Sequence, residues 1–143
     1  MENIAFDIWL SDRLKFGSED KRDCFETAKK MVHITAIARK DGLTAAAEEV
    51  KEMHDIFLEI AVKLAVDGFS SQRIKTVMQN YIIAGNYRGG ALLKRILVTE
   101  TIMLIVHGYS PKQICEELAS FFGEDFYKEY MAYCGVGEVD GGQ

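Results

Sequence analysis

The sequence predicts an all-α protein, folded as a compact bundle of six to eight helices. Apolar residues recur at helical spacing through most of the chain, only one proline interrupts it, and no segment sustains the alternation typical of a strand. With 143 residues, 48% of them apolar, the chain is long enough to bury one core. We place a single helical domain at residues 1–135 and a flexible C-terminal tail at 136–143.

Glycines and hydroxyl residues predict where the first helices begin and end. A short amphipathic helix is expected at 4–10, and a longer one at 19–40 that ends at Gly42. Thr44 is the expected N-cap of the next helix. A further helix is expected at 54–66, with Ile56, Ile60 and Leu64 along its apolar side.

The second half of the chain follows the same logic. Ser70 is expected to cap a helix whose inward side includes Tyr81, and the Gly-rich stretch 84–90 is expected to be a loose connector. A long helix is predicted at 91–106. The next helix should begin with a capping box at Ser110, followed by Pro111 at the first helical position. An aromatic-rich helix is expected to end the domain, with its aromatic residues either in the core or at a dimer interface.

One helix–turn–helix sequence occurs twice in the chain, at positions forty residues apart. "LAVDGFSSQRI" ends at Ile74 and "LIVHGYSPKQI" ends at Ile114. In each copy a glycine allows the positive φ found at many helix ends, and a serine two residues later caps the following helix. The sequence therefore predicts two similar helix–G[FY]S–helix hairpins, from a duplication or from convergence on a good corner.

Composition limits the classes of partner and the cellular compartment that fit this chain. A net charge of −5 with scattered Lys and Arg argues against binding of nucleic acid, which needs a basic face. No run of about 20 apolar residues predicts a membrane span, and "MENIAFDIWL" lacks the basic start of a signal peptide. The three cysteines include no C-x-x-C pair. We expect a reduced, cytoplasmic protein.

No set of residues predicts catalysis, a metal site or a cofactor. His54, Asp55 and Glu59 could form one corner of a metal site, although a solvated helix start is the simpler explanation. "GNYRGG", residues 85–90, could cradle a phosphate, but it lacks the lysine and the preceding strand of a P-loop. No cysteine has an identifiable activating base. We therefore expect a protein that is not an enzyme.

Three segments, taken in order, resemble one family. "ITAIARKDGLTAAAEE", "FLEIAVKLAVDGFSSQRIKTVM" and "ILVTETIMLIVHGYSPKQICEEL" are similar to cytoplasmic segments of MotA, the channel-forming stator subunit of the bacterial flagellar motor in the MotA/TolQ/ExbB family. The resemblance covers roughly residues 34–122. The family's transmembrane helices have no counterpart here, so the resemblance implies the cytoplasmic helical region alone, without ion conduction.

The resemblance also implies a protein partner. In MotA an Arg and a Glu of the first segment contact the rotor protein FliG. The Arg position matches Arg39, whereas the Glu position falls on Ala47, with Glu48 one residue later. Arg39 and Glu48 are thus the candidate partner-binding residues, and flagellar rotor or stator proteins, or a second copy of the chain, are the candidate partners. The alternative is a regulatory protein that binds a small molecule between the duplicated hairpins.

Overall fold

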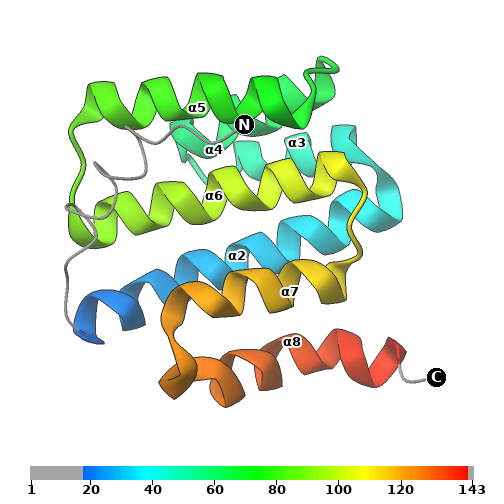
Figure 1. Cartoon of the computed structure of the whole chain (residues 1–143). Helices are drawn as coiled ribbons and strands as arrows, with labels where there is room; N and C mark the ends of the chain where they lie inside the picture. The colour runs from blue at the N-terminus through cyan, green and yellow to red at the C-terminus, as the bar shows by residue number, and fades with distance from the viewer. Residues whose placement is uncertain (1–17, 142–143) are drawn as a thin grey trace.

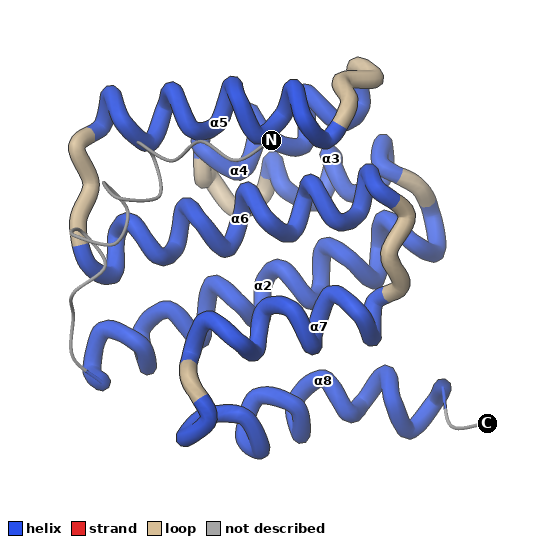
Figure 2. The backbone as a smooth tube through the Cα atoms, in the orientation of Figure 1, coloured by secondary structure: helices blue, strands red, loops and turns tan. Residues whose placement is uncertain are grey.

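The fold is a bundle of α-helices, as the sequence predicts. A computed structural model describes the backbone of residues 18–141 and the side chains of residues 21–134. Within residues 18–141 the chain forms seven α-helices and two 3-10 helices, without a strand (Figure 2). The α-helices are α2 (Ser18–Asp41), α3 (Leu43–Lys51), α4 (Ile56–Val66), α5 (Ser71–Gly85), α6 (Gly89–His107), α7 (Pro111–Ala119) and α8 (Tyr127–Gly141). The 3-10 helices, Ser120–Phe122 and Glu124–Phe126, join α7 to α8.

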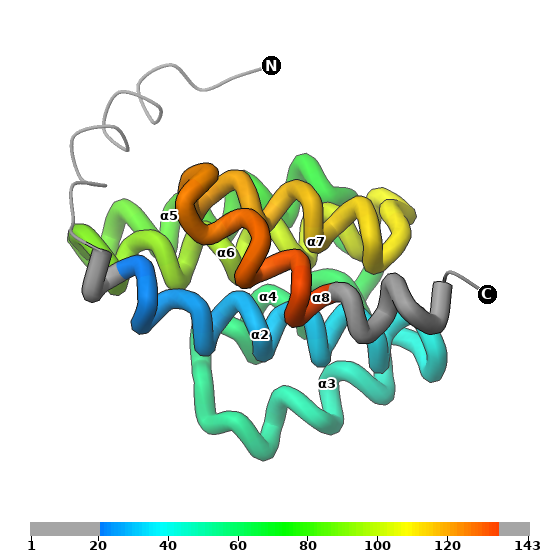
Figure 3. Tube along the Cα trace, turned by 90° about the horizontal axis from the view of Figure 1, so that it is seen from below, coloured from blue at the N-terminus to red at the C-terminus, as the bar shows by residue number. Residues whose placement is uncertain are grey.

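Helix α6 is the centre of the bundle. It packs against α2, α4, α5 and α7, with α5 on one side of it and α2 on the other (Figure 1). Its buried side chains point in all directions around the helix, as is typical of a helix enclosed by others. They are Leu92, Leu93, Ile96, Leu97, Val98, Thr99, Thr101, Ile102 and Leu104. Helices α3 and α8 contact fewer neighbours and lie at the periphery (Figure 3).

The two predicted corners have the same geometry. Gly68 has φ of 89° and Gly108 has φ of 93°. Serine caps follow in both, because the Ser70 side chain accepts from the backbone N–H of Arg73 at 3.2 Å and Ser110 accepts from that of Gln113 at 3.1 Å. The second corner also has the predicted capping box, in which Gln113 Oε1 accepts from Ser110 N–H at 2.9 Å. The prediction of twin hairpins is confirmed, and they are α4–α5 and α6–α7.

Two local predictions were wrong. Gly42, and not Thr44, is the N-cap of α3, and it makes no side-chain cap. Its φ of 98° lets the chain turn directly from α2 into α3, so Thr44 already lies inside the helix. Tyr81 is 46% exposed, and not inward. Helix α5 buries only the narrow line of Ile74, Met78 and Ile82, and Tyr81 lies beside that line.

The Gly-rich stretch 84–90 is mostly helical, contrary to expectation. Helix α5 continues to Gly85 and α6 begins at Gly89, which leaves three connecting residues. Asn86 takes the left-handed conformation that ends α5, with φ of 56°. The Tyr87 ring lies so close to Gly85 that a Cβ there would collide with it. The connector between α5 and α6 therefore packs against the end of α5 and is not a loose loop.

The sequence predicts a helix near the N-terminus and a flexible tail at the C-terminus. The helix expected at 4–10 lies outside the described residues. At the other end, α8 continues to Gly141, so the backbone of 136–141 is helical where a tail was expected.

Candidate functional site

An apolar groove lies between α3 and α4. These two consecutive helices bury one face each, through Ala46 and Val50 of α3 and four residues of α4. Beside the buried line they leave a cavity of about 310 Å³ that is open to solvent. Its lining is mostly aliphatic: Ala47, Val50, Lys51, Ile56, Glu59, Ile60, Val62, Lys63 and Val66.

Two aliphatic side chains of this groove face solvent. Ile56 is 73% exposed and Val66 is 42% exposed. Ile56 was expected on the apolar side of α4 with Ile60 and Leu64, and in the structure its side chain is exposed to solvent. Every residue of α4 other than Glu59 and Lys63 is apolar. Because a helix at the surface can bury only part of its circumference, some of these apolar residues have to remain exposed.

Charged side chains border the groove. Lys63 Nζ donates to Asp67 Oδ2 at 2.8 Å, and this hydrogen bond is the main cause of the raised pKa of Lys63. Lys51 Nζ donates to Glu48 Oε2 at 3.4 Å. Both lysines are exposed, so these pairs add little to stability. Together, the two pairs place positive and negative side chains around the aliphatic lining of the groove.

The two sequence-predicted partner residues lie on different helices. Arg39 is exposed in the last turn of α2, and Glu48 is exposed on α3. Glu48 reaches the rim through its contact with Lys51, and Ala47, its neighbour in sequence, lines the groove itself. Among the described residues, no ion pair joins Arg39 to Glu48. The lining of the groove comes from α3 and α4, and neither Arg39 nor Glu48 is part of it.

The twin corners contact each other directly. Ser71 Oγ and His107 Nδ1 are hydrogen-bonded at 3.2 Å, and the His107 and Tyr109 rings lie 5.5 Å apart. His107 is the last residue of α6. The α3–α4 groove does not lie between the two hairpins, where the alternative function would place a ligand.

A second cavity, polar in character, opens at the N-terminal end of α6. It has a volume of about 480 Å³ and is lined by Asp23, Arg88, Gly89, Gly90, Ala91, Lys94 and Arg95. Arg88 is the N-cap residue of α6 but makes no side-chain cap, and the first turn has no acidic residue. The Arg95 guanidinium stacks on the Tyr87 ring at 3.7 Å. Part of the "GNYRGG" segment thus lines a cavity with three basic residues.

The residues considered for a metal site do not form one. Asp55 uses its carboxylate to cap α4, accepting from Leu58 N–H at 3.1 Å, while His54 is exposed. Within the described residues, no group of three His, Cys, Asp or Glu side chains could hold a metal ion.

Comparison with known proteins adds no relative. Neither known protein families, nor curated proteins, nor solved structures match this chain. In the described part of the chain, no helix combines the length and the apolar character that crossing a bilayer requires.

Proposed function

We propose that this chain is a protein-interaction domain that binds an apolar segment of a partner in the α3–α4 groove. The observation that carries the proposal is the exposure of Ile56, at 73%, beside an open aliphatic cavity. Exposed aliphatic surface next to a cavity and rimmed by charge is typical of interaction sites. Covering an aliphatic side chain of this size contributes about 1–2 kcal/mol to binding before the cost of association.

We further propose that the partner is a rotor or stator component of the bacterial flagellar motor. The support for this partner is the ordered resemblance of three segments to the cytoplasmic region of MotA. Arg39, at the matched position, is exposed and available for such a contact. The role is one of binding, without catalysis.

Capture of partners by the purified chain from the lysate of its own host tests both proposals. The variants are Ile56→Asp in the groove, Arg39→Glu on α2, and Ile83→Asp on α5 as the control. Ile83 is 47% exposed, so the control places the same new charge on an exposed isoleucine far from the groove in sequence. Circular dichroism of each variant verifies that the helices are retained.

The two proposals have separate outcomes. We expect Ile56→Asp to abolish capture of the main partner and Ile83→Asp to leave it unchanged. Equal capture by both variants would refute the groove as the binding site. Mass spectrometry then identifies the captured protein, and only rotor or stator proteins lost on Arg39→Glu would support a role in the motor. Self-association lost on Ile56→Asp would instead make the groove a homodimer interface.

A second candidate function, binding of a small anion, is favoured by the basic cavity at the start of α6. Arg88, Lys94 and Arg95 line it together with the backbone of Gly89 and Gly90. Anions are stabilised by uncompensated backbone N–H groups of this kind and by guanidinium groups. Pyrophosphate should raise the melting temperature of the wild type, because a ligand that binds only the folded state stabilises it.

The variants of that cavity decide between specific and general anion effects. Arg88→Ala combined with Lys94→Ala should remove the pyrophosphate shift. Lys40→Ala, an exposed cation at the far end of α2, should keep it. An identical shift in all proteins would exclude this cavity as the binding site.

A further inference from the structure

The segment that precedes the described part of the chain, residues 1–17, is rich in apolar side chains. Six of the eight residues in "NIAFDIWL" are apolar, and the sequence predicts an amphipathic helix there with Ile4, Ile8 and Trp9 on one side. Large apolar side chains are stabilised when another surface removes them from water. The segment is therefore a candidate ligand for an open apolar surface of the same chain.

The α3–α4 groove has the size and the apolar character that such a ligand needs. Its volume is about 310 Å³, its lining is mostly aliphatic, and Ile56 beside it is 73% exposed. An apolar cavity of about 150 Å³ is enough to bind benzene. The groove is about twice as large, so it can take the indole ring of Trp9 together with an aliphatic neighbour.

The charges of the segment complement those of the groove. Residues 1–12 contain three acidic residues and neither Lys nor Arg. The groove lining contains two exposed lysines, Lys51 and Lys63, and one acidic residue, Glu59. Both lysines pair with neighbouring acids at the surface, and exposed pairs of this kind are weak enough to exchange partners. Opposite charges across the contact would favour this segment over a basic one.

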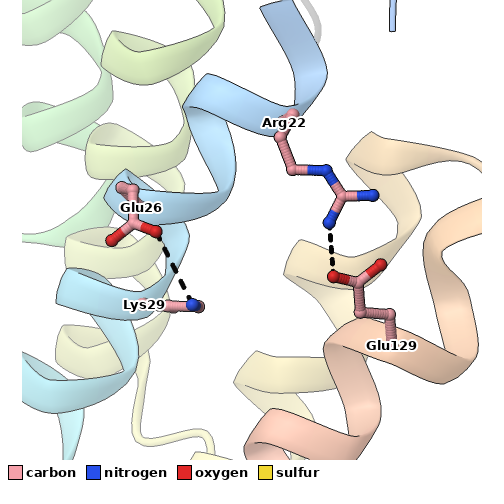
Figure 4. A network of polar contacts seen from close by, with 4 residues as sticks. All are labelled: Arg22, Glu26, Lys29 and Glu129. Atoms are coloured by element: carbon pink, nitrogen blue, oxygen red, sulfur yellow. Dashed lines mark hydrogen bonds and ion pairs between the residues drawn. The ribbon is translucent and has the colours of Figure 1, made fainter. Parts of the chain in front are cut away.

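The point where the segment joins the bundle is held in place. Arg22 of α2 forms an ion pair with Glu129 of α8 (Figure 4). Two residues later, Cys24 Sγ donates to the Gly90 carbonyl at 3.4 Å, at the start of α6. These contacts fix the first turns of α2 against two other helices, so the segment leaves the bundle from a defined position.

The groove lies within reach of that position. Helix α3 runs back along α2 toward the start of α2 (Figure 3), and His33 Nε2 lies 3.1 Å from Glu49 Oε2 of α3. Ser18 precedes His33 by fifteen residues, which is about 22 Å of helix. Residues 11–17, when extended, span about 23–25 Å. The predicted N-terminal helix can therefore reach the Ile56 end of the groove.

We propose that residues 1–17 bind in the α3–α4 groove of their own chain, with Ile8 and Trp9 against the aliphatic lining, and that a partner has to displace them. The proposal rests on the proposed function, since it assigns a regulator to the same groove. A short tether gives an effective concentration of about millimolar, so even a weak contact keeps the groove occupied. Occupancy by the segment lowers the apparent affinity of a partner, because only chains with a free groove can bind it.

The fluorescence of Trp9 tests this without a partner. Trp9 is the only tryptophan, so the emission maximum and acrylamide quenching of the full chain report on one side chain. We expect wild-type emission at shorter wavelength than that of the urea-unfolded chain. Ile56→Asp and Ile8→Asp should each shift it to longer wavelength and increase quenching. Ile83→Asp, the matched control on α5, should leave both unchanged, and circular dichroism verifies that each variant keeps its helices.

Three results would overturn the proposal. The first is wild-type emission equal to that of the urea-unfolded chain, which can be read even if a variant fails to fold. The second is a shielded Trp9 that Ile56→Asp does not affect, because the segment would then lie elsewhere. The third is a shift that disappears on dilution, which would assign the segment to the groove of a second copy.

Partner capture separates this inference from the proposed function. Ile8→Asp should capture several-fold more of the main partner than the wild type, because it frees the groove. Loss of capture in Ile56→Asp, together with a wild-type Trp9 that is fully exposed, would overturn the inference and leave the proposed function standing. A Trp9 shift in Ile56→Asp without any change in capture would support binding of the segment and refute the groove as the partner site.

Discussion

Replacing the glycine of each twin corner with alanine tests whether the two corners are energetically as well as geometrically alike. Gly68 and Gly108 have nearly equal φ angles of 89° and 93°. The next backbone N–H returns to the preceding helix in both, from Phe69 to the Leu64 carbonyl at 3.0 Å and from Tyr109 to the Leu104 carbonyl at 3.1 Å. Each glycine therefore lies at a helix end with the same backbone hydrogen-bond pattern.

The size of the effect follows from the surroundings of each glycine. A Cβ added at either position would meet no heavy atom within 4 Å, so steric collision contributes nothing. What remains is the cost of a left-handed conformation for an L-residue, about 1–2 kcal/mol. The lower entropy of the unfolded alanine chain offsets about 0.4–1 kcal/mol of this. We expect each substitution to reduce the free energy of unfolding by about 1 kcal/mol.

Urea denaturation measures this difference directly. With a slope of about 1–3 kcal/mol per molar urea, each alanine should lower the midpoint by roughly 0.3–1 M. Asparagine at the same positions should cost less, since this chain already ends α5 with Asn86 at φ of 56°. A loss of several kcal/mol at one corner only, or none at either, would refute the reasoning from equal backbone strain.

Three further substitutions test the electrostatics of a half-buried carboxyl group and the exposure of the groove. Burial, followed by the charge of Glu117, raises the pKa of Glu100 above its ordinary value of 4.5. The folded protein then holds this proton more tightly than the unfolded chain, so wild-type stability falls as pH rises through the range above 4.5. Glu100→Gln should raise the melting temperature at neutral pH and make no difference below about pH 4, whereas a constant difference at all pH values would contradict the assignment. On α4, Leu58→Ala should cost about 2–5 kcal/mol in urea denaturation because Leu58 is wholly buried, while Ile56→Ala, 73% exposed, should cost under about 1 kcal/mol; equal losses would contradict the exposure of Ile56.

Predictions that depend on local chemistry succeeded. The caps at Ser70 and Ser110 involve residues three positions apart, so sequence spacing alone places donor and acceptor within reach. The helix that begins near Ala91 was also predictable, because its apolar residues continue without a break. Gly42 shows the limit of the method, since glycine and threonine both fit an N-cap and only the backbone path from α2 into α3 distinguishes them.

The candidate site was less predictable than the fold. Periodicity shows that α4 is apolar, but it does not show which part of its circumference α3 and α6 cover. The sequence therefore predicts Ile56 on the apolar side of the helix without indicating that it is exposed. The signal available was the shortage of polar residues on a helix expected to reach the surface.

By itself the sequence determined an all-α chain, most of the helix ends, and a corner built twice from Gly, an aromatic residue and Ser. These features depend on residues within one or two helical turns of each other, where chain connectivity limits the choices. Only the tertiary structure decided that an aliphatic groove stays open between α3 and α4, and that α8 packs against α7. Both depend on how neighbouring helices approach each other, and that approach is set by the packing of many side chains distant in the sequence.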